Sequence, residues 1–232
     1  MENTEEKNQL DLDATLVETS HKIESFYENN KKAINYGFIG IVVAIVLYVG
    51  FKQYYLEPKE KEAQAAMFRA QSWFEQDSFN LALNGKGDAE GFNAIAENYG
   101  MTKAANLAHY YAGVCCMRTG DFNGAIDHLD DFSTDNELIG PLATGLLGDA
   151  YVETGDIEKG AGLYMKAANQ GKNKLTAPYF LKKAGTAFEE LKQYGKAADA
   201  YSKIKKEYAE SQEAGDIDKY IARAEALEAN NN

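Results

Sequence analysis

The hydropathy pattern is dominated by one apolar run near the N-terminus. Residues 33–51 include no formally charged side chain, and as an α-helix they would extend about 28 Å. That length is close to the ~30 Å hydrocarbon core of a bilayer. Lys31 and Lys32 precede the run and Lys52 follows it. A soluble helix of this length normally has a polar face, so the pattern predicts a transmembrane helix over residues 33–56 rather than a buried helix of a soluble domain.

A polar arm, residues 1–32, precedes this helix. It carries eight acidic residues and four lysines, whereas a signal peptide begins with a short basic segment. We therefore predict an uncleaved signal anchor, with the arm in the cytoplasm and the larger C-terminal part across the membrane. Leu12, Leu16, Ile23 and Phe26 recur at roughly helical spacing. The arm is thus expected to be partly helical, either as an amphipathic helix on a membrane or partner, or as a largely solvated segment.

Three segments after the apolar run share one pattern, over residues 110–132, 145–168 and 181–204. Aligned on the first small residue of each, they repeat at intervals of 35 and 37 residues. The aligned small residues are Gly113, Gly148 and Gly185. Each segment predicts a helix, a tight turn and a second helix. The turn carries Gly120, Gly155 or Lys192, and glycine at this position can adopt a positive φ.

These segments resemble the tetratricopeptide repeat. The small–aromatic–small order of that family is matched by Gly148, Tyr151, Gly160, Tyr164 and Ala167, and in the third unit by Gly185, Phe188, Ala197 and Tyr201. The first unit has Cys116 where the aromatic is usual.

The resemblance implies an all-α protein in which the N-terminal transmembrane helix is followed by an α-solenoid of about three clear repeats over residues 105–210. A linker helix and a divergent first helix pair are expected over residues 57–104. Within that segment the pattern predicts one helix from residue 59 to about 83 and another over residues 89–99, separated by a Gly-Lys-Gly-Asp turn. Residues 211–232 are expected to form a polar capping helix and a frayed tail, because an end repeat otherwise exposes its apolar face.

The charge composition argues against one class of function. The chain has 36 acidic and 24 basic side chains, a net charge of −12. This argues against a general nucleic-acid binder, which needs a cationic surface. Charge is unevenly distributed: residues 75–156 hold 14 acids and three bases, whereas residues 172–206 hold nine lysines. Such a dipolar domain either steers a charged partner or presents two solvated faces.

Few residues are arranged in a pattern that is typical of catalysis or metal binding. Cys115 and Cys116 are adjacent and do not form a CxxC pattern, so we interpret them as packing residues rather than as a vicinal disulfide or a thiol site. Asp127 to Asp135 form an acidic stretch without the glycine of a calcium loop. His109 and His128 each lack a second ligand at helical spacing and are assigned structural roles. No nucleophile elbow, phosphate-binding loop or HExxH motif is present. We expect no catalytic residue, no metal, no cofactor and no small-molecule substrate.

The functional surface is therefore expected in the concave groove of the solenoid, formed by the first helix of each repeat. Exposed Tyr, Met and Arg side chains there suit a bound peptide or loop, although some of these residues could instead pack between repeats. The predicted groove residues are Tyr110, Val114, Met117, Arg118, Asp149, Val152, Glu153, Tyr179, Lys182, Thr186 and Glu190.

The complete layout of acidic arm, single span and repeat domain resembles the YfgM-type family of ancillary subunits of the bacterial SecYEG translocon. The lead-in to the span, Phe26-Tyr27-Glu28-Asn29-Asn30-Lys31-Lys32-Ala33, is similar to that of the family. The resemblance implies an inner-membrane protein with a periplasmic repeat domain that partners a membrane-anchored periplasmic chaperone of the PpiD type. The alternatives are a cell-envelope assembly scaffold unrelated to protein export, a redox protein or enzyme that uses the cysteines, and a homo-oligomer formed through the arm.

Overall fold

The computed structural model describes residues 27–33, 35–171 and 173–231, so the predicted helix of the arm up to residue 26 lies outside the described residues. The chain divides into two compact units, Met1–Glu57 and Pro58–Asn232. The described residues are helical apart from turns and loops, and their only β-pairing is an isolated bridge between Lys86 and Ala89.

In the first unit, residues 35–51 are α-helical and continue into a π-helical turn, η1 (Lys52–Leu56). Every side chain from residue 35 to residue 49 is exposed, and Leu47, for example, retains 68% of its accessible surface. The helical stretch Asn35–Glu75 includes a window that is long and apolar enough to cross a membrane.

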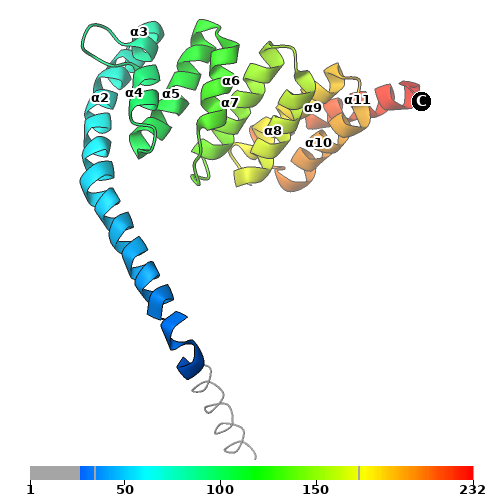
Figure 1. Cartoon of the computed structure of the whole chain (residues 1–232). Helices are drawn as coiled ribbons and strands as arrows, with labels where there is room; N and C mark the ends of the chain where they lie inside the picture. Colours follow the sequence, from blue (N-terminus) through cyan, green and yellow to red (C-terminus); the bar gives the residue numbers. More distant parts are fainter. Residues whose placement is uncertain (1–26, 34, 172, 232) are drawn as a thin grey trace, which may run out of the picture. The chain divides into compact units, whose positions relative to one another are not determined.

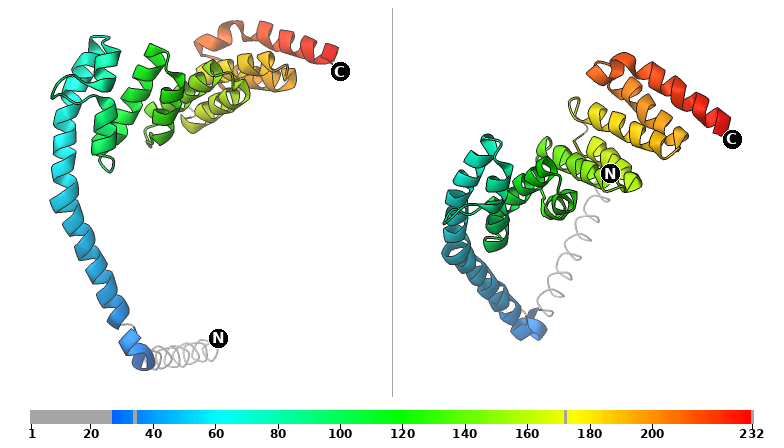
Figure 2. Two further views of the ribbon diagram at one scale, coloured as in Figure 1. Left: turned by 45° about the horizontal axis from the view of Figure 1, so that its top comes forward. Right: turned by 90° about the horizontal axis from the view of Figure 1, so that it is seen from above.

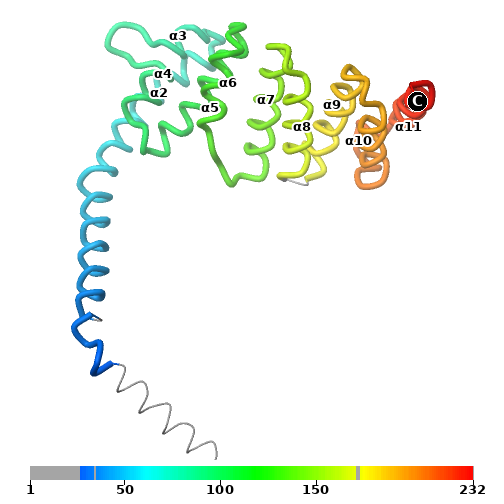
Figure 3. The backbone as a smooth tube through the Cα atoms, turned by 45° about the vertical axis from the view of Figure 1, so that its right-hand side comes forward, coloured from blue at the N-terminus to red at the C-terminus, as the bar shows by residue number. Residues whose placement is uncertain are grey.

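The second unit is a series of helices in which consecutive members lie side by side and antiparallel from α4 to α11 (Figures 1 and 3). Figure 2 shows the same order from two other directions. The helices are α2 (Glu57–Glu75), α3 (Phe79–Asn84), α4 (Phe92–Asn98), α5 (Lys103–Thr119), α6 (Phe122–Asp131), α7 (Ile139–Glu153), α8 (Ile157–Gly171), α9 (Ala177–Glu190), α10 (Tyr194–Glu207), the short η2 (Gln212–Asp216) and α11 (Ile217–Asn231).

The helix predicted from residue 59 to about 83 is wrong in one respect, because it is broken between α2 and α3. Asp77 adopts a left-handed conformation with φ of 54°, and the Ser78 N–H donates to the Trp73 carbonyl at 2.9 Å. The turn folds Phe79 back onto Phe74, with ring centroids 5.6 Å apart. The apolar spacing continues through the turn, so periodicity alone does not reveal it. The next helix, α4, is also shorter than predicted and begins at Phe92.

The aligned glycines of the three repeats lie where two helices approach most closely. A Cβ built on Gly113 would lie 2.6 Å from the Leu129 side chain, and one on Gly185 would lie 2.3 Å from the Tyr201 ring. At Gly148 the closest atom belongs to Tyr164, at 2.9 Å. Each contacted side chain follows its glycine by 16 residues. The repeat register read from the sequence is therefore confirmed by the packing.

In each Gly-Asp turn, the glycine follows the end of one helix and the aspartate caps the start of the next. Gly120 ends α5 with φ of 81°, and the Asp121 side chain accepts the Gly124 N–H at 3.0 Å at the start of α6. Asp156 caps α8 in the same way, accepting the Lys159 N–H at 3.1 Å. These side chains satisfy N–H groups that the helix itself leaves unpaired.

The core of the second unit consists of two clusters. One joins buried residues of α2 to α7, with Phe92 and Ile95 fully buried. The other joins α8 to α11 and includes Leu181 and Tyr201, also fully buried. This stacking of helical hairpins creates a surface between α7 and α9.

Candidate functional site

A groove of about 430 Å³ lies where α5, α7 and α9 come together, with one residue contributed by α8. It is called the α7/α9 groove below. Its lining residues are Met117, Asp149, Val152, Glu153, Tyr164, Tyr179, Lys182, Lys183, Thr186, Ala187 and Glu190.

Eight of the eleven residues predicted from the repeat register line this groove. The three that do not are Tyr110, Val114 and Arg118, all from α5. Tyr110 is half-buried, with its ring 5.3 Å from that of Phe132. The Arg118 guanidinium lies 6.0 Å from the centroid of the Phe79 ring. The groove is thus centred on the second and third repeats.

Sequence reasoning missed Tyr164, Lys183 and Ala187. Tyr164 belongs to the second helix of its repeat, and its position in the motif indicated only packing. Lys183 and Ala187 each follow a predicted groove residue directly in the sequence. A groove between two helices is lined by more than one residue per helical turn. Lys183 and Ala187 could therefore have been predicted as the sequence neighbours of predicted groove residues.

The floor of the groove is a fixed polar network around Asp149. The Tyr164 hydroxyl donates to Asp149 Oδ1 at 2.6 Å, and Lys183 Nζ lies 2.5 Å from the same oxygen. Burial, followed by the hydrogen bond to Asp149, raises the pKa of Tyr164 well above its usual range. Tyr164 therefore remains a neutral donor, and the charge of Asp149 is balanced within the protein by Lys183.

The second lysine of the groove is also paired. Lys182 Nζ lies 3.1 Å from Asp216 Oδ1 and 4.7 Å from the centroid of the Tyr220 ring. Lys219 Nζ approaches the other oxygen of Asp216 at 2.6 Å. Hydrogen bonds from Lys219 and Lys182 lower the pKa of Asp216, so this carboxylate stays ionised beside both lysines.

Apolar and acidic side chains complete the groove. Val152 and Met117 are half-buried, and the Tyr179 ring is 46% exposed. Glu153 and Glu190 are exposed. An apolar lining, a pre-formed polar floor and an exposed aromatic ring are the features of a site that binds another molecule non-covalently.

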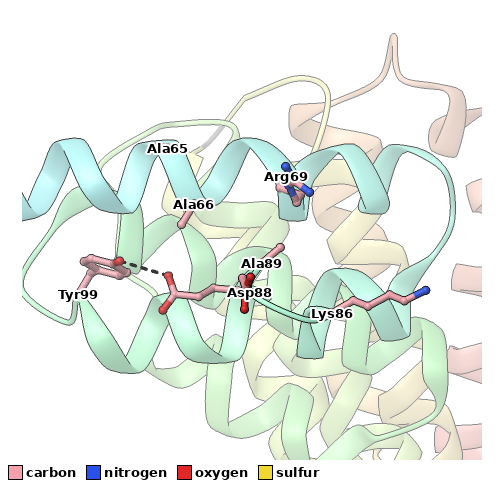
Figure 4. Close-up of a pocket in the computed structure, with 8 residues that line it drawn as sticks. Ala65, Ala66, Arg69, Lys86, Asp88, Ala89 and Tyr99 are labelled. Atoms are coloured by element: carbon pink, nitrogen blue, oxygen red, sulfur yellow. Dashed lines mark hydrogen bonds between the residues drawn. The ribbon is translucent and has the colours of Figure 1, made fainter.

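A larger cavity of about 620 Å³ lies between α2 and the loop that joins α3 to α4 (Figure 4). Figure 4 shows Tyr99 at one end of it, with its hydroxyl donating to Glu90 Oε2 at 3.2 Å. Burial, with a smaller contribution from Glu90, raises the pKa of Tyr99. The remaining lining is three alanines with Arg69, Lys86 and Asp88. It therefore offers little apolar surface besides one ring.

The cysteines pack inside α5, as predicted, with Cys115 fully buried and Cys116 nearly so. Burial raises the pKa of Cys115 to about 12 and that of Cys116 to about 11. Since the thiolate is the reactive form, both side chains lie in surroundings that suppress nucleophilic chemistry.

The two histidines assigned independent structural roles lie together across the α5–α6 hairpin. His109 Nδ1 and His128 Nδ1 are 3.2 Å apart, a contact that spacing along a single helix does not reveal. Asp131 Oδ2 lies 4.0 Å from His109 Nδ1. Burial and the neighbouring His109 lower the pKa of His128. Among the described residues, no group of three or more His, Cys, Asp or Glu side chains is arranged to hold a metal ion.

Comparison with known proteins supports the fold. No protein-family model and no curated protein sequence matches this chain. A kinesin light chain-like protein of Podosopora anserina with nearly identical TPR-like repeats superposes with a TM-score of 0.53, at 10% sequence identity, over 74% of this chain and 89% of that one. A single-substitution variant of it gives a TM-score of 0.53, at 11% identity, over 74% and 88%. The described solenoid therefore has a TPR-like repeat fold.

Proposed function

We propose that this chain is a non-catalytic, membrane-anchored adaptor whose TPR-like domain binds a protein partner in the α7/α9 groove. The observation that carries the proposal is the convergence of eight register-predicted positions on one groove with an exposed aromatic ring and an apolar wall. Solenoids of this kind present extended concave surfaces for binding.

The anchor rests on the exposed apolar side chains of residues 35–49. An apolar surface of this size is unfavourable in water and marks a membrane or protein contact. After alkaline extraction of membranes, the full chain is expected in the pellet. Val42→Arg/Val46→Arg should release it, because each arginine in the centre of a span costs about 2.5–3.5 kcal/mol. The matched control Ala222→Arg/Ala226→Arg, on exposed positions of α11, should remain in the pellet. Release of the unaltered chain would contradict the anchor.

The groove is tested with two exposed aromatic residues. Tyr179 lies in the groove, whereas Phe68 lies on α2 with 78% of its surface exposed. When the full chain is purified in mild detergent after crosslinking, Tyr179→Ala should recover less of the partner, and Phe68→Ala should recover as much as the unaltered chain. Equal recovery with both variants would show that the groove is not the binding surface.

The resemblance to the YfgM-type family supports a more specific proposal. The chain would be an accessory subunit of the SecYEG translocon in a bacterial inner membrane, with the N-terminus in the cytoplasm and the repeat domain in the periplasm. Its partner would be a membrane-anchored chaperone of the PpiD type or an emerging client. Co-isolation of the translocon pore is one expected result. The other is that added protease leaves the repeat domain intact in whole cells but digests it in spheroplasts, in which the periplasmic face of the inner membrane is accessible. Reproducible absence of the pore would favour the alternative, a cell-envelope assembly scaffold.

The absence of catalysis is proposed from the burial of the two thiols. Cys115→Ala/Cys116→Ala should bind the partner as well as the unaltered chain does, because neither thiol lines the α7/α9 groove. If the folded double variant lost its function, a redox or enzymatic role would be favoured instead.

A further inference from the structure

Among the described residues, the lysines of the α7/α9 groove have ion-pair partners, whereas two of its glutamates do not. Both of its lysines are paired within the protein: Lys183 lies 2.5 Å from Asp149, and Lys182 lies 3.1 Å from Asp216, a carboxylate that it shares with Lys219. Two groove carboxylates, Glu153 and Glu190, are exposed, and in the described part of the chain neither forms an ion pair or a side-chain hydrogen bond. Because the lining holds the three carboxylates of Asp149, Glu153 and Glu190 and only two lysines, the charge that a partner meets is negative.

The helix ends add to this negative potential. Glu153 is the last residue of α7 and Glu190 the last of α9. The C-terminus of a helix carries a partial negative charge, so a carboxylate there is unfavourable and a cation is favourable. In the first repeat the same register position holds Arg118, near the end of α5. The second and third repeats thus keep an acidic side chain where the first carries the cation that the helix end favours.

Resting on the proposed function, we infer that the α7/α9 groove binds an extended polypeptide segment in which a lysine or arginine lies next to a large apolar side chain. The cation meets Glu153, Glu190 and the two helix ends. The apolar side chain contacts Val152, Met117 and the Tyr179 ring.

The dimensions of the groove favour an extended segment. Its volume of about 430 Å³ is near the lower end of ligand-binding clefts, and a complete helix is about 10 Å across. A segment that inserts a few side chains fits this space better than a helix does. An acidic segment fits the charges poorly, because it would have to displace Asp149 or Asp216 from its lysine while facing Glu153 and Glu190.

The experiment uses the full chain in a neutral, non-ionic detergent, so that cationic probes have no anionic lipid to bind. Fluorescence anisotropy is measured with three labelled peptides that share leucine and phenylalanine and carry, at the same positions, lysine, glutamate or serine. The variants are Glu153→Gln/Glu190→Gln in the groove and Glu97→Gln/Glu225→Gln on exposed positions of α4 and α11. Both pairs change the net charge equally. Circular dichroism confirms folding, and Tyr179→Ala reports whether the groove is occupied.

The lysine peptide should bind most tightly. Glu153→Gln/Glu190→Gln should weaken its binding by about 2- to 30-fold, from two exposed charge interactions of typical strength, and Glu97→Gln/Glu225→Gln should leave its binding unchanged. The inference is overturned if the glutamate peptide binds as tightly as the lysine peptide, or if Glu153→Gln/Glu190→Gln does not change the affinity for the lysine peptide. Charge-independent binding that Tyr179→Ala weakens would overturn this inference alone. Binding that Tyr179→Ala does not weaken, or no binding of any peptide, would overturn it together with the proposed groove.

Discussion

The packing of α7 against α9 predicts that the same substitution will have opposite effects at two glycines. A Cβ built on Gly145 of α7 would lie 1.9 Å from Phe180 Cε1 and 2.2 Å from Cζ. The Phe180 ring is only 3% exposed and stacks near Tyr164, with centroids 6.5 Å apart. The ring cannot move away without disturbing its neighbours. By contrast, a Cβ on Gly162 of α8 would meet no atom within 4 Å.

Gly145→Ala should therefore destabilise the protein. Overpacking a well-filled core costs about 1–3 kcal/mol, and a contact this short belongs near the upper end. Alanine recovers up to ~1 kcal/mol through its higher helix propensity, so the expected net loss is about 1–2 kcal/mol. Gly162→Ala should instead stabilise the protein by about 0.5–1 kcal/mol, because only the propensity gain applies.

The assay is urea denaturation of the full chain in non-ionic detergent, followed by far-UV circular dichroism, with the two variants and the unaltered protein measured together. The midpoint should fall for Gly145→Ala and rise for Gly162→Ala, with little change in the slope. A Gly145→Ala variant as stable as the unaltered protein would refute the close packing of α7 on Phe180. If Gly162→Ala were less stable than the unaltered protein, the exposed and uncrowded position of Gly162 on α8 would be refuted.

Three further predictions concern single residues or pairs. Lys192 has φ of 57° where the other two repeats have glycine, so Lys192→Gly should stabilise the protein by up to ~1 kcal/mol in the same denaturation assay; a loss of stability would contradict this. Cys115 and Cys116 should react with a thiol reagent only when the protein unfolds. Because their pKa values are raised to about 12 and about 11 from 9.0, stability should be retained below pH 9 and decline above it, as the unfolded thiols ionise first; Cys115→Ala/Cys116→Ala should flatten that decline. The pKa of His128 is lowered from 6.5, so its contribution is present above pH 6.5 and lost as the pH falls through the folded pKa. His128→Gln should reduce this acid sensitivity in a pH series of denaturation midpoints, and an unchanged series would refute the assignment.

Repeated spacing made much of the solenoid predictable. Gly113, Gly148 and Gly185 set the register, and the structure places each against the side chain 16 residues later. The same register predicted eight residues of the groove, because helices in equivalent positions present equivalent faces. Spacing along the chain is enough to predict a contact wherever the same contact recurs in each repeat.

Features that depend on a single contact were not predictable in this way. The break at Asp77 leaves the apolar periodicity intact, so only the packing of Phe79 on Phe74 reveals it. The His109–His128 contact joins two helices and follows from no spacing within either. The sequence identifies Tyr164 only as an aromatic residue of the repeat motif, although its hydroxyl also donates a hydrogen bond to Asp149 in the groove.

Binding of another protein to the α7/α9 groove of an anchored solenoid is the interaction on which the proposed function depends. Its most direct test is photocrosslinking in native membranes, with a photoreactive amino acid incorporated at Tyr179 in the groove or at Glu158, an exposed position on α8. A discrete adduct is expected from position 179 in the membrane fraction, and none is expected from position 158. The same adducts from both positions, or none from position 179, would contradict it.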